Sequence, residues 1–285
     1  MTRLSNSWKL FKISWGVLRN DTSLAMFPVL GGIAVVAVAA AFGGLFVVTG
    51  VEETTSATGT TSTGLAPIGY VFIALAYVAI AFVTVYFQAG LTVAADRSLR
   101  GEDSTVGGGL REANARLPIL FAWALVVATI SLIIRAIEER FGFLGRIVAG
   151  LFGAAWNIVT FLAIPVVVIE RVGPGRALKR SGSLLKQTWG ENIVGQFGFG
   201  LFALVAMLPA FALFAGAAGL MSVVSIPLVA IGVVWVLGVV VVVSALTGIY
   251  RVALYRFAVD EVPPLAFAGA DFDQAFRQRG GRAGF

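Results

Sequence analysis

Long uninterrupted apolar stretches decide what this chain can fold into. As helices, six of them are long enough to cross a hydrocarbon core about 30 Å thick. They cover residues 28–48, 67–94, 117–134, 147–169, 193–217 and 226–249. Because the stretches are continuous rather than alternating, they favour helices over the strands of a β-barrel. We therefore predict an all-α fold, a polytopic membrane bundle of about six transmembrane helices with amphipathic interfacial helices on the cytoplasmic side.

The composition supports this class and argues against a soluble protein. Of the 285 residues, 58% are apolar and only 13% are charged, where soluble domains carry about 25% charged residues. The net charge of +6 would suggest nucleic acid as a partner of a soluble protein, but in a membrane protein it reflects cytoplasmic loops beside anionic lipid. We expect a multi-pass protein of the cell membrane that binds no nucleic acid.

The basic residues predict the orientation. All of the 21 Lys and Arg residues except Arg135, Arg140 and Arg146 lie before the first stretch, after the second, after the fourth or after the sixth. The positive-inside rule therefore places both termini in the cytoplasm. We interpret residues 1–285 as a single integral membrane domain, with a cytoplasmic amphipathic helix at 1–27, a six-helix bundle at 28–249 and a cytoplasmic tail at 250–285. The first stretch spans a full bilayer, so we interpret it as a span rather than a signal peptide.

Two cationic amphipathic segments precede spans. In "GPGRALKRSGSLLKQTW", residues 173–189, helical spacing gathers the cations on one arc and leucines with Trp189 on the other. The N-terminal segment has the same design, with an apolar stripe that includes Trp15 beside a row of cations. Tryptophan suits the headgroup region and basic side chains attract anionic lipid. The predicted contacts to lipid headgroups or a partner are Lys9, Lys12, Trp15, Arg176, Lys179, Arg180, Lys186 and Trp189.

These segments also reveal an internal repeat. Residues 11–20 align without gaps on residues 178–187, matching Lys12 with Lys179, Ser14 with Ser181 and Leu18 with Leu185. Residues 109–120 form a shorter third copy. The chain thus reads as three units, each an amphipathic segment followed by a two-span hairpin. Such repeats build many transporters, and they also build inert bundles.

Little in the spans points to chemistry. The chain lacks cysteine and histidine, which excludes thiolate sites and histidine bases, and we expect no catalytic residue, metal or cofactor. The polar candidates within spans are Gln88, Asn157 and Gln196. They could form interhelical hydrogen bonds or line a substrate path. At the end of the fourth span, Glu170 could anchor the fold by pairing with Arg176 or with the tail.

Two outer connections differ in character. Residues 51–64 are rich in threonine, serine and glycine, which predicts a flexible exposed link. Residues 135–146 mix charges with aromatic side chains, which predicts a short interfacial helix on the outer side.

Three passages carry a family resemblance. Residues 165–196, "SWKLFKISWGVLRNDTSLAMFP" and "GIYRVALYRFAVDEVPP" resemble an uncharacterised prokaryotic family of multi-span membrane proteins. The chain is also distantly similar to the membrane domain attached to some glycerophosphodiester phosphodiesterases, and "ERVGPGRALKRS" with the following "WGEN" is the most specific part. The resemblance implies an integral membrane protein of about six helices with no assigned activity. The histidines and metal-binding carboxylates of the phosphodiesterase domain have no counterpart here.

Two functional hypotheses remain at this stage. The first is a non-enzymatic integral membrane protein that engages anionic membrane lipids through its cationic segments, or that joins a membrane complex with a protein partner or as a homo-oligomer. The alternative is a small-solute or lipid transporter or permease with a path near Gln88, Asn157 and Gln196.

Overall fold

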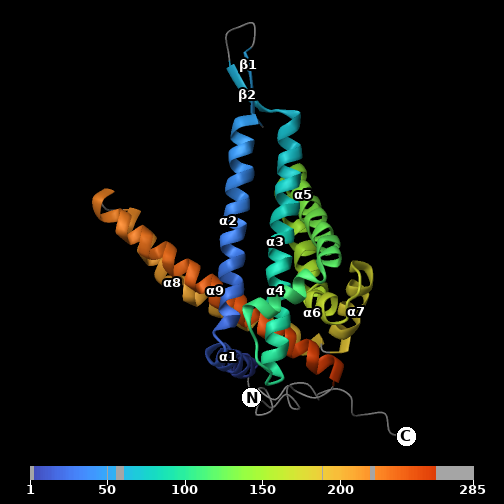
Figure 1. Cartoon of the computed structure of the whole chain (residues 1–285). Helices are drawn as coiled ribbons and strands as arrows, with labels where there is room; N and C mark the ends of the chain where they lie inside the picture. The colour runs from blue at the N-terminus through green and yellow to red at the C-terminus, as the bar shows by residue number, and fades with distance from the viewer. Residues whose placement is uncertain (1–2, 50, 56–60, 188, 219–221, 261–285) are drawn as a thin grey trace.

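The computed structural model describes residues 3–49, 51–55, 61–187, 189–218 and 222–260 (Figure 1). Helices make up nearly all of this part of the chain, with one small β-hairpin. The elements are α1 (Arg3–Asn20), α2 (Ser23–Thr49), β1 (Val51–Thr55), β2 (Thr61–Leu65), α3 (Pro67–Leu99), α4 (Val106–Asn114), α5 (Leu117–Val159), α6 (Ala163–Ile169), α7 (Pro174–Gln187), α8 (Trp189–Ala218) and α9 (Ser222–Asp260).

The predicted fold class is confirmed. Five described segments are long and apolar enough to cross a membrane: Ser23–Thr49, Pro67–Leu99, Leu117–Arg140, Gly142–Ile169 and Ser225–Asp260. α8 corresponds to the remaining predicted span, and its part from Phe202 to Ala218 is apolar but shorter. Large apolar side chains along these helices face outward, as in Val48, which is 80% exposed. A bilayer solvates such surfaces where water would not.

Some predicted boundaries shift by several residues. The helix expected to begin at Pro28 begins at Ser23, where the Asp21 carboxylate accepts a hydrogen bond from the Ser23 amide at 3.2 Å. That acceptor satisfies a backbone donor that no helical carbonyl reaches. α9 continues past residue 249 to Asp260, as expected for a tail whose first residues extend the sixth helix.

Both outer connections differ from their predictions. Residues 135–146 form no separate interfacial helix, because α5 continues through them and reverses at Gly142, with φ 56° and ψ −129°. Only glycine adopts that conformation readily. At the reversal the chain passes so close to itself that a Cβ on Gly145 would lie 2.4 Å from the Ile137 carbonyl oxygen. In the link predicted to be flexible, β1 and β2 pair in antiparallel register from Val51 opposite Leu65 to Thr55 opposite Thr61.

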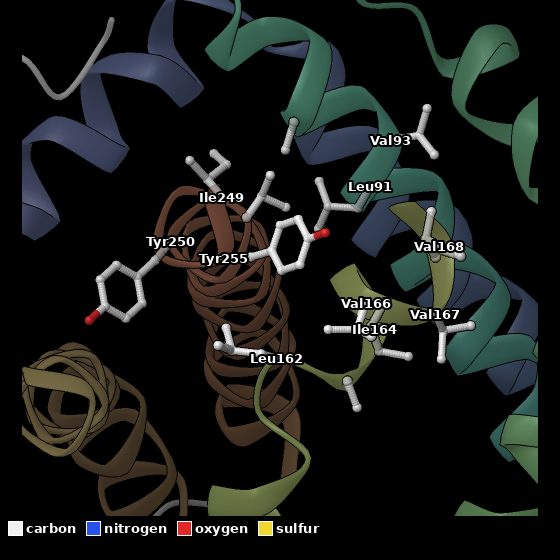
Figure 2. Packing of buried hydrophobic residues seen from close by; sticks show 14 of the residues in the cluster. Leu91, Val93, Leu162, Ile164, Val166, Val167, Val168, Ile249, Tyr250 and Tyr255 are labelled. Atoms are coloured by element: carbon white, nitrogen blue, oxygen red, sulfur yellow. The ribbon is translucent and has the colours of Figure 1, made fainter. Parts of the chain in front are cut away.

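The buried core lies at one end of the bundle, opposite the β-hairpin (Figure 1). We call this end, where α1, α4 and α7 gather, the basal end. The second span of each hairpin reaches it, so α3, α6 and α9 contact one another there. Figure 2 shows their apolar side chains together, with Tyr255 extending from α9 towards those of α3 and α6. The Leu91 side chain packs directly on Gly248, where an added Cβ would lie 2.4 Å from it.

The α8–α9 hairpin leans away from α2 and α3 towards the far end of the bundle (Figure 1). Its two helices hold each other through a hydrogen bond from the Trp235 indole N–H to the Ala206 carbonyl at 2.8 Å. Near its base, the hairpin contacts α1, where the Phe11 and Phe202 rings lie 4.2 Å apart.

Candidate functional site

The basal helices α1 and α7 bury equivalent faces. Ser14 and Ser181, which the repeat aligns, are both 0% exposed, and the aligned Leu18 and Leu185 are buried as well. On the opposite face, the aligned Lys12 and Lys179 are exposed. The positions that the sequence repeat aligns therefore also match in whether they are buried or exposed.

α4 follows the same pattern in the middle unit. Ala113 occupies the position of the two serines and is fully buried, while Arg111 occupies that of Lys12 and is exposed. Each of these three helices, which we call the elbow helices, packs on the second span of the preceding unit: α4 on α3, α7 on α6, and α1 on α9. The three units thereby close into a ring.

Most predicted headgroup contacts are exposed at the surface of this ring. Lys12, Arg176, Lys179 and Lys186 are exposed, and Trp15 is 44% exposed. Arg180 is also exposed, but its Nε donates a hydrogen bond to Glu170 at 3.1 Å. Arg180 is therefore partly structural. Lys9 lies in α1 and Trp189 begins α8, and their side chains fall outside the described part of the structure.

The aligned serines differ in hydrogen bonding. The Ser181 hydroxyl donates to the Val159 carbonyl at 2.6 Å, at the point where α5 ends and the chain turns into α6. It thereby satisfies one of the carbonyls that a helix terminus leaves without a helical partner. The Ser14 hydroxyl is buried without a hydrogen-bond partner. The same position thus carries a structural bond in one unit and none in the other.

A charge cluster between units was not predicted. Arg256 of α9 forms a two-pronged ion pair with Asp96 of α3, with N–O distances of 2.6 and 2.8 Å. Arg100 adds a third contact to Asp96 at 2.7 Å. The Asp96 side chain is only 8% exposed. The signal available in the sequence was an aspartate directly after an apolar stretch with an arginine at a similar position in the tail.

Glu170 holds the corresponding position in the second unit. "AADR" around Asp96 and "VIER" around Glu170 both end an apolar run with an acid followed by arginine. Glu170 accepts hydrogen bonds from the Tyr255 hydroxyl and from Arg180, each at 3.1 Å. Its predicted anchoring to the tail is thus confirmed through Tyr255, while its basic partner is Arg180 rather than Arg176. α9 therefore contacts the acids of both other units.

Further polar contacts fix the connections at the basal end. The Ser104 and Ser23 hydroxyls both donate to the Asp21 carboxylate, which ties the α1–α2 turn to the α3–α4 turn. Arg116 donates to Glu112 at 2.6 Å, and this hydrogen bond holds the pKa of Glu112 below its usual value. These contacts hold neighbouring segments of the basal end together.

Arg251 is a half-buried cation of α9. Its guanidinium carbon lies 4.9 Å from the centroid of the Phe161 ring, a cation–π geometry. Its Nε is buried without a hydrogen-bond acceptor.

The residues proposed for an intramembrane path are not joined by any contact in the described structure. Gln88 of α3 is half-buried, and its backbone carbonyl accepts a hydrogen bond from Thr92 at 2.8 Å. Asn157 of α5 is exposed on the bundle surface, and the Gln196 side chain lies outside the described part. The path stays a prediction.

A second polar cluster lies towards the opposite end. Arg135, assigned by sequence to an outer connection, donates to the Tyr77 hydroxyl at 2.7 Å and to Glu139 at 2.8 Å. Tyr77 is ten residues into α3, or about 15 Å along the helix from its start. The cluster borders a pocket of about 440 Å³ with Ser131 and Glu138. No group of carboxylates in the described residues is arranged to hold a metal ion.

The fold and the basal face define a multi-span integral membrane protein that carries cationic amphipathic helices at one end. The chain belongs to a family of unknown function, DUF6159, whose model matches residues 67–263. No curated protein and no solved structure matches the chain. The resemblance to an uncharacterised family is thus confirmed, whereas no similarity to glycerophosphodiester phosphodiesterases is found.

Proposed function

We propose that this chain is a non-enzymatic protein of the cell membrane that binds anionic phospholipid headgroups through α1 and α7, with its basal end and both termini on the cytoplasmic side. One observation carries the proposal. Two helices far apart in sequence bury the same face and leave the same cationic face exposed. If those cations served only to terminate spans, they would not need matching positions on two packed amphipathic helices.

The expected strength follows from the exposed charges. A basic side chain near an anionic leaflet contributes about 1 kcal/mol. Arg176, Lys179 and Lys186 are exposed on α7, and none of them pairs with a carboxylate in the part of the chain that the structure describes. Together they would contribute about 3 kcal/mol, or about a hundredfold in affinity. Arg180 is left out of this set because it binds Glu170.

The test compares two charge-matched double variants. Lys179→Gln with Lys186→Gln removes two basal cations, and Arg140→Gln with Arg146→Gln removes two exposed cations from the α5 reversal and the segment after it. Phosphatidylglycerol bound to each protein after gentle extraction is measured by native mass spectrometry, with phosphatidylcholine as the competing lipid. We expect loss of phosphatidylglycerol from the basal variant only. Equal retention by the two variants would overturn the proposal.

Orientation is tested with single cysteines, since the natural chain has none. Ser183 is exposed on α7, unlike the neighbouring buried Ser181, and is the suitable basal position. We expect Ser183→Cys to react with an impermeant maleimide only from the cytoplasmic side, and Thr58→Cys, in the connection between β1 and β2, only from outside. Reversed labelling would refute the orientation.

A further inference from the structure

An apolar groove of about 650 Å³ runs along the α8–α9 hairpin and ends at Trp15 of α1. Phe202 and Ala206 of α8 form one wall, and Val234, Trp235 and Gly238 of α9 form the other. The indole N–H of Trp235 already donates to the Ala206 carbonyl at 2.8 Å, so this ring needs no acceptor from an occupant of the groove. The groove therefore offers a surface for apolar atoms.

The position of this groove determines what can fill it. α9 is apolar and membrane-spanning along the lining residues, and Val234 is 70% exposed. Around Gly238 there is open space, with nothing within 4 Å of an added Cβ. In a bilayer, such an opening borders hydrocarbon rather than water. An acyl chain matches an opening that is lined by apolar and aromatic side chains.

The cations of α1 flank Trp15, the α1 residue that lines the groove. Lys12, Trp15 and Arg19 are spaced i, i+3 and i+7, which places them along one stripe of the helix. All three are exposed, so a cation lies about one turn from the indole on each side. A phospholipid whose chain passes Trp15 would bring its phosphate between these two cations.

The repeat supplies an internal comparison. The equivalent stripe on α7 is Lys179, Gly182 and Lys186, which keeps both cations but has glycine in place of Trp15. The α7 stripe thus has no aromatic ring at the position from which Trp15 lines the groove on α1. The aromatic end of the groove therefore distinguishes the α1 surface from a general cationic surface.

From these observations we propose that α1, α8 and α9 form a specific site for one anionic phospholipid, with its phosphate at Lys12 and Arg19 and one acyl chain in the groove. This inference rests on the proposed headgroup-binding function and adds a defined site and a requirement for the acyl chain. α7 then binds headgroups without selecting the chain.

The experiment fills the groove without changing charge. Gly238→Leu occupies the open space on α9, and Gly44→Leu is the matched control, because Gly44 is also exposed on a spanning helix with nothing within 4 Å of its Cβ position. Retention of dioleoyl phosphatidylglycerol is measured by native mass spectrometry for both, and for Lys12→Gln with Arg19→Gln. We expect at least a fivefold loss of retained lipid for Gly238→Leu and for the charge variant, and none for Gly44→Leu.

The outcomes separate the site from the underlying function. If the charge variant loses lipid and Gly238→Leu does not, headgroup binding stands and the groove site is wrong. If neither this charge variant nor the α7 variant loses lipid, the proposed function itself fails. Should Gly238→Leu not fold, the wild-type protein is treated with phosphatidylglycerol that carries a photoreactive acyl chain. Labelling within residues 230–242 supports the site, and labelling spread over α2 overturns it. A photoreactive residue at Val234 that captures a second copy or another polypeptide instead of lipid also overturns it.

Discussion

The ion pair between Asp96 and Arg256 is the interaction whose loss should most weaken the basal end. It joins α3 of the first unit to α9 of the third, 160 residues apart. Asp96→Asn keeps the size of the side chain but removes its charge. Arg256 then loses its closest carboxylate partner in a half-buried position.

The magnitude follows from the burial of the two partners. Breaking a buried ion pair by removing one charge costs about 3–5 kcal/mol. Arg256 is 22% exposed, so solvent reaches part of the guanidinium and lowers the cost. Arg256 also keeps a contact to Asp260 at 3.6 Å. We therefore expect Asp96→Asn to reduce the free energy of unfolding by about 2–3 kcal/mol.

The assay is a double-mutant cycle of unfolding in mixed micelles, with Asp96→Asn, Arg256→Gln and the double variant. We expect a coupling energy of about 2 kcal/mol between the two positions. The control is Arg100→Gln, because Arg100 also contacts Asp96 but is 50% exposed, and we expect it to cost under about 1 kcal/mol. A coupling energy below about 0.5 kcal/mol would refute the claim that this pair holds α9 to α3.

Three further predictions concern the serine pair, the α5 reversal and the pH dependence of α4. Ser181→Ala should lower the free energy of unfolding by about 1–2 kcal/mol because the Val159 carbonyl loses its donor. Ser14→Ala should be neutral or stabilising because the buried Ser14 hydroxyl has no hydrogen-bond partner in the described structure. Equal effects of the two variants in the same micelle assay would contradict this account. Gly142→Ala should cost about 1–3 kcal/mol, since φ 56° with ψ −129° strains any residue with a Cβ; an unchanged unfolding midpoint would show that the reversal tolerates a side chain. Because its hydrogen bond with Arg116 lowers the pKa of Glu112, the stability that Glu112 contributes should be complete above pH 4.5 and lost as the pH falls below that value. Glu112→Gln should weaken the fall of the unfolding free energy at acidic pH. An identical fall in both proteins would assign this loss of stability to other groups.

The spans were predictable because their signal is local. A run of about 20 apolar residues has few alternatives in a bilayer. The reversal at Gly142 was not predictable from the sequence, because the charges of residues 135–146 suggest a helix at the membrane interface. Only the backbone conformation shows that α5 turns back on itself there. The hairpin at residues 51–65 was missed for a similar reason. Its threonines and glycine fit a flexible link by composition, and strand pairing depends on how α2 and α3 bring its ends together.

In the candidate site too, local features were predictable from the sequence and long-range contacts were not. The exposed cations of α1 and α7 followed from helical spacing, because amphipathicity is readable within one turn or two. The partners of Asp96 and Glu170 lie 160 and 85 residues away in α9, and no periodicity within a segment specifies such a contact. Arg180 shows the consequence for function. Its sequence environment matches that of Lys179, but only the fold reveals that it binds Glu170.

The three units share the elbow helices that close the ring, but they differ in the residues that end their second spans. The first two end their second spans with an acid, Asp96 or Glu170, and the third has Tyr255 and Arg256 in the matching place. Three buried acids at this junction would repel one another. Because the third unit lacks its acid and supplies donors instead, Arg256 binds Asp96 and Tyr255 binds Glu170. α9 can therefore seat against both other units, and this seating also presents α1, which packs on α9, with its cationic stripe at the end of the groove.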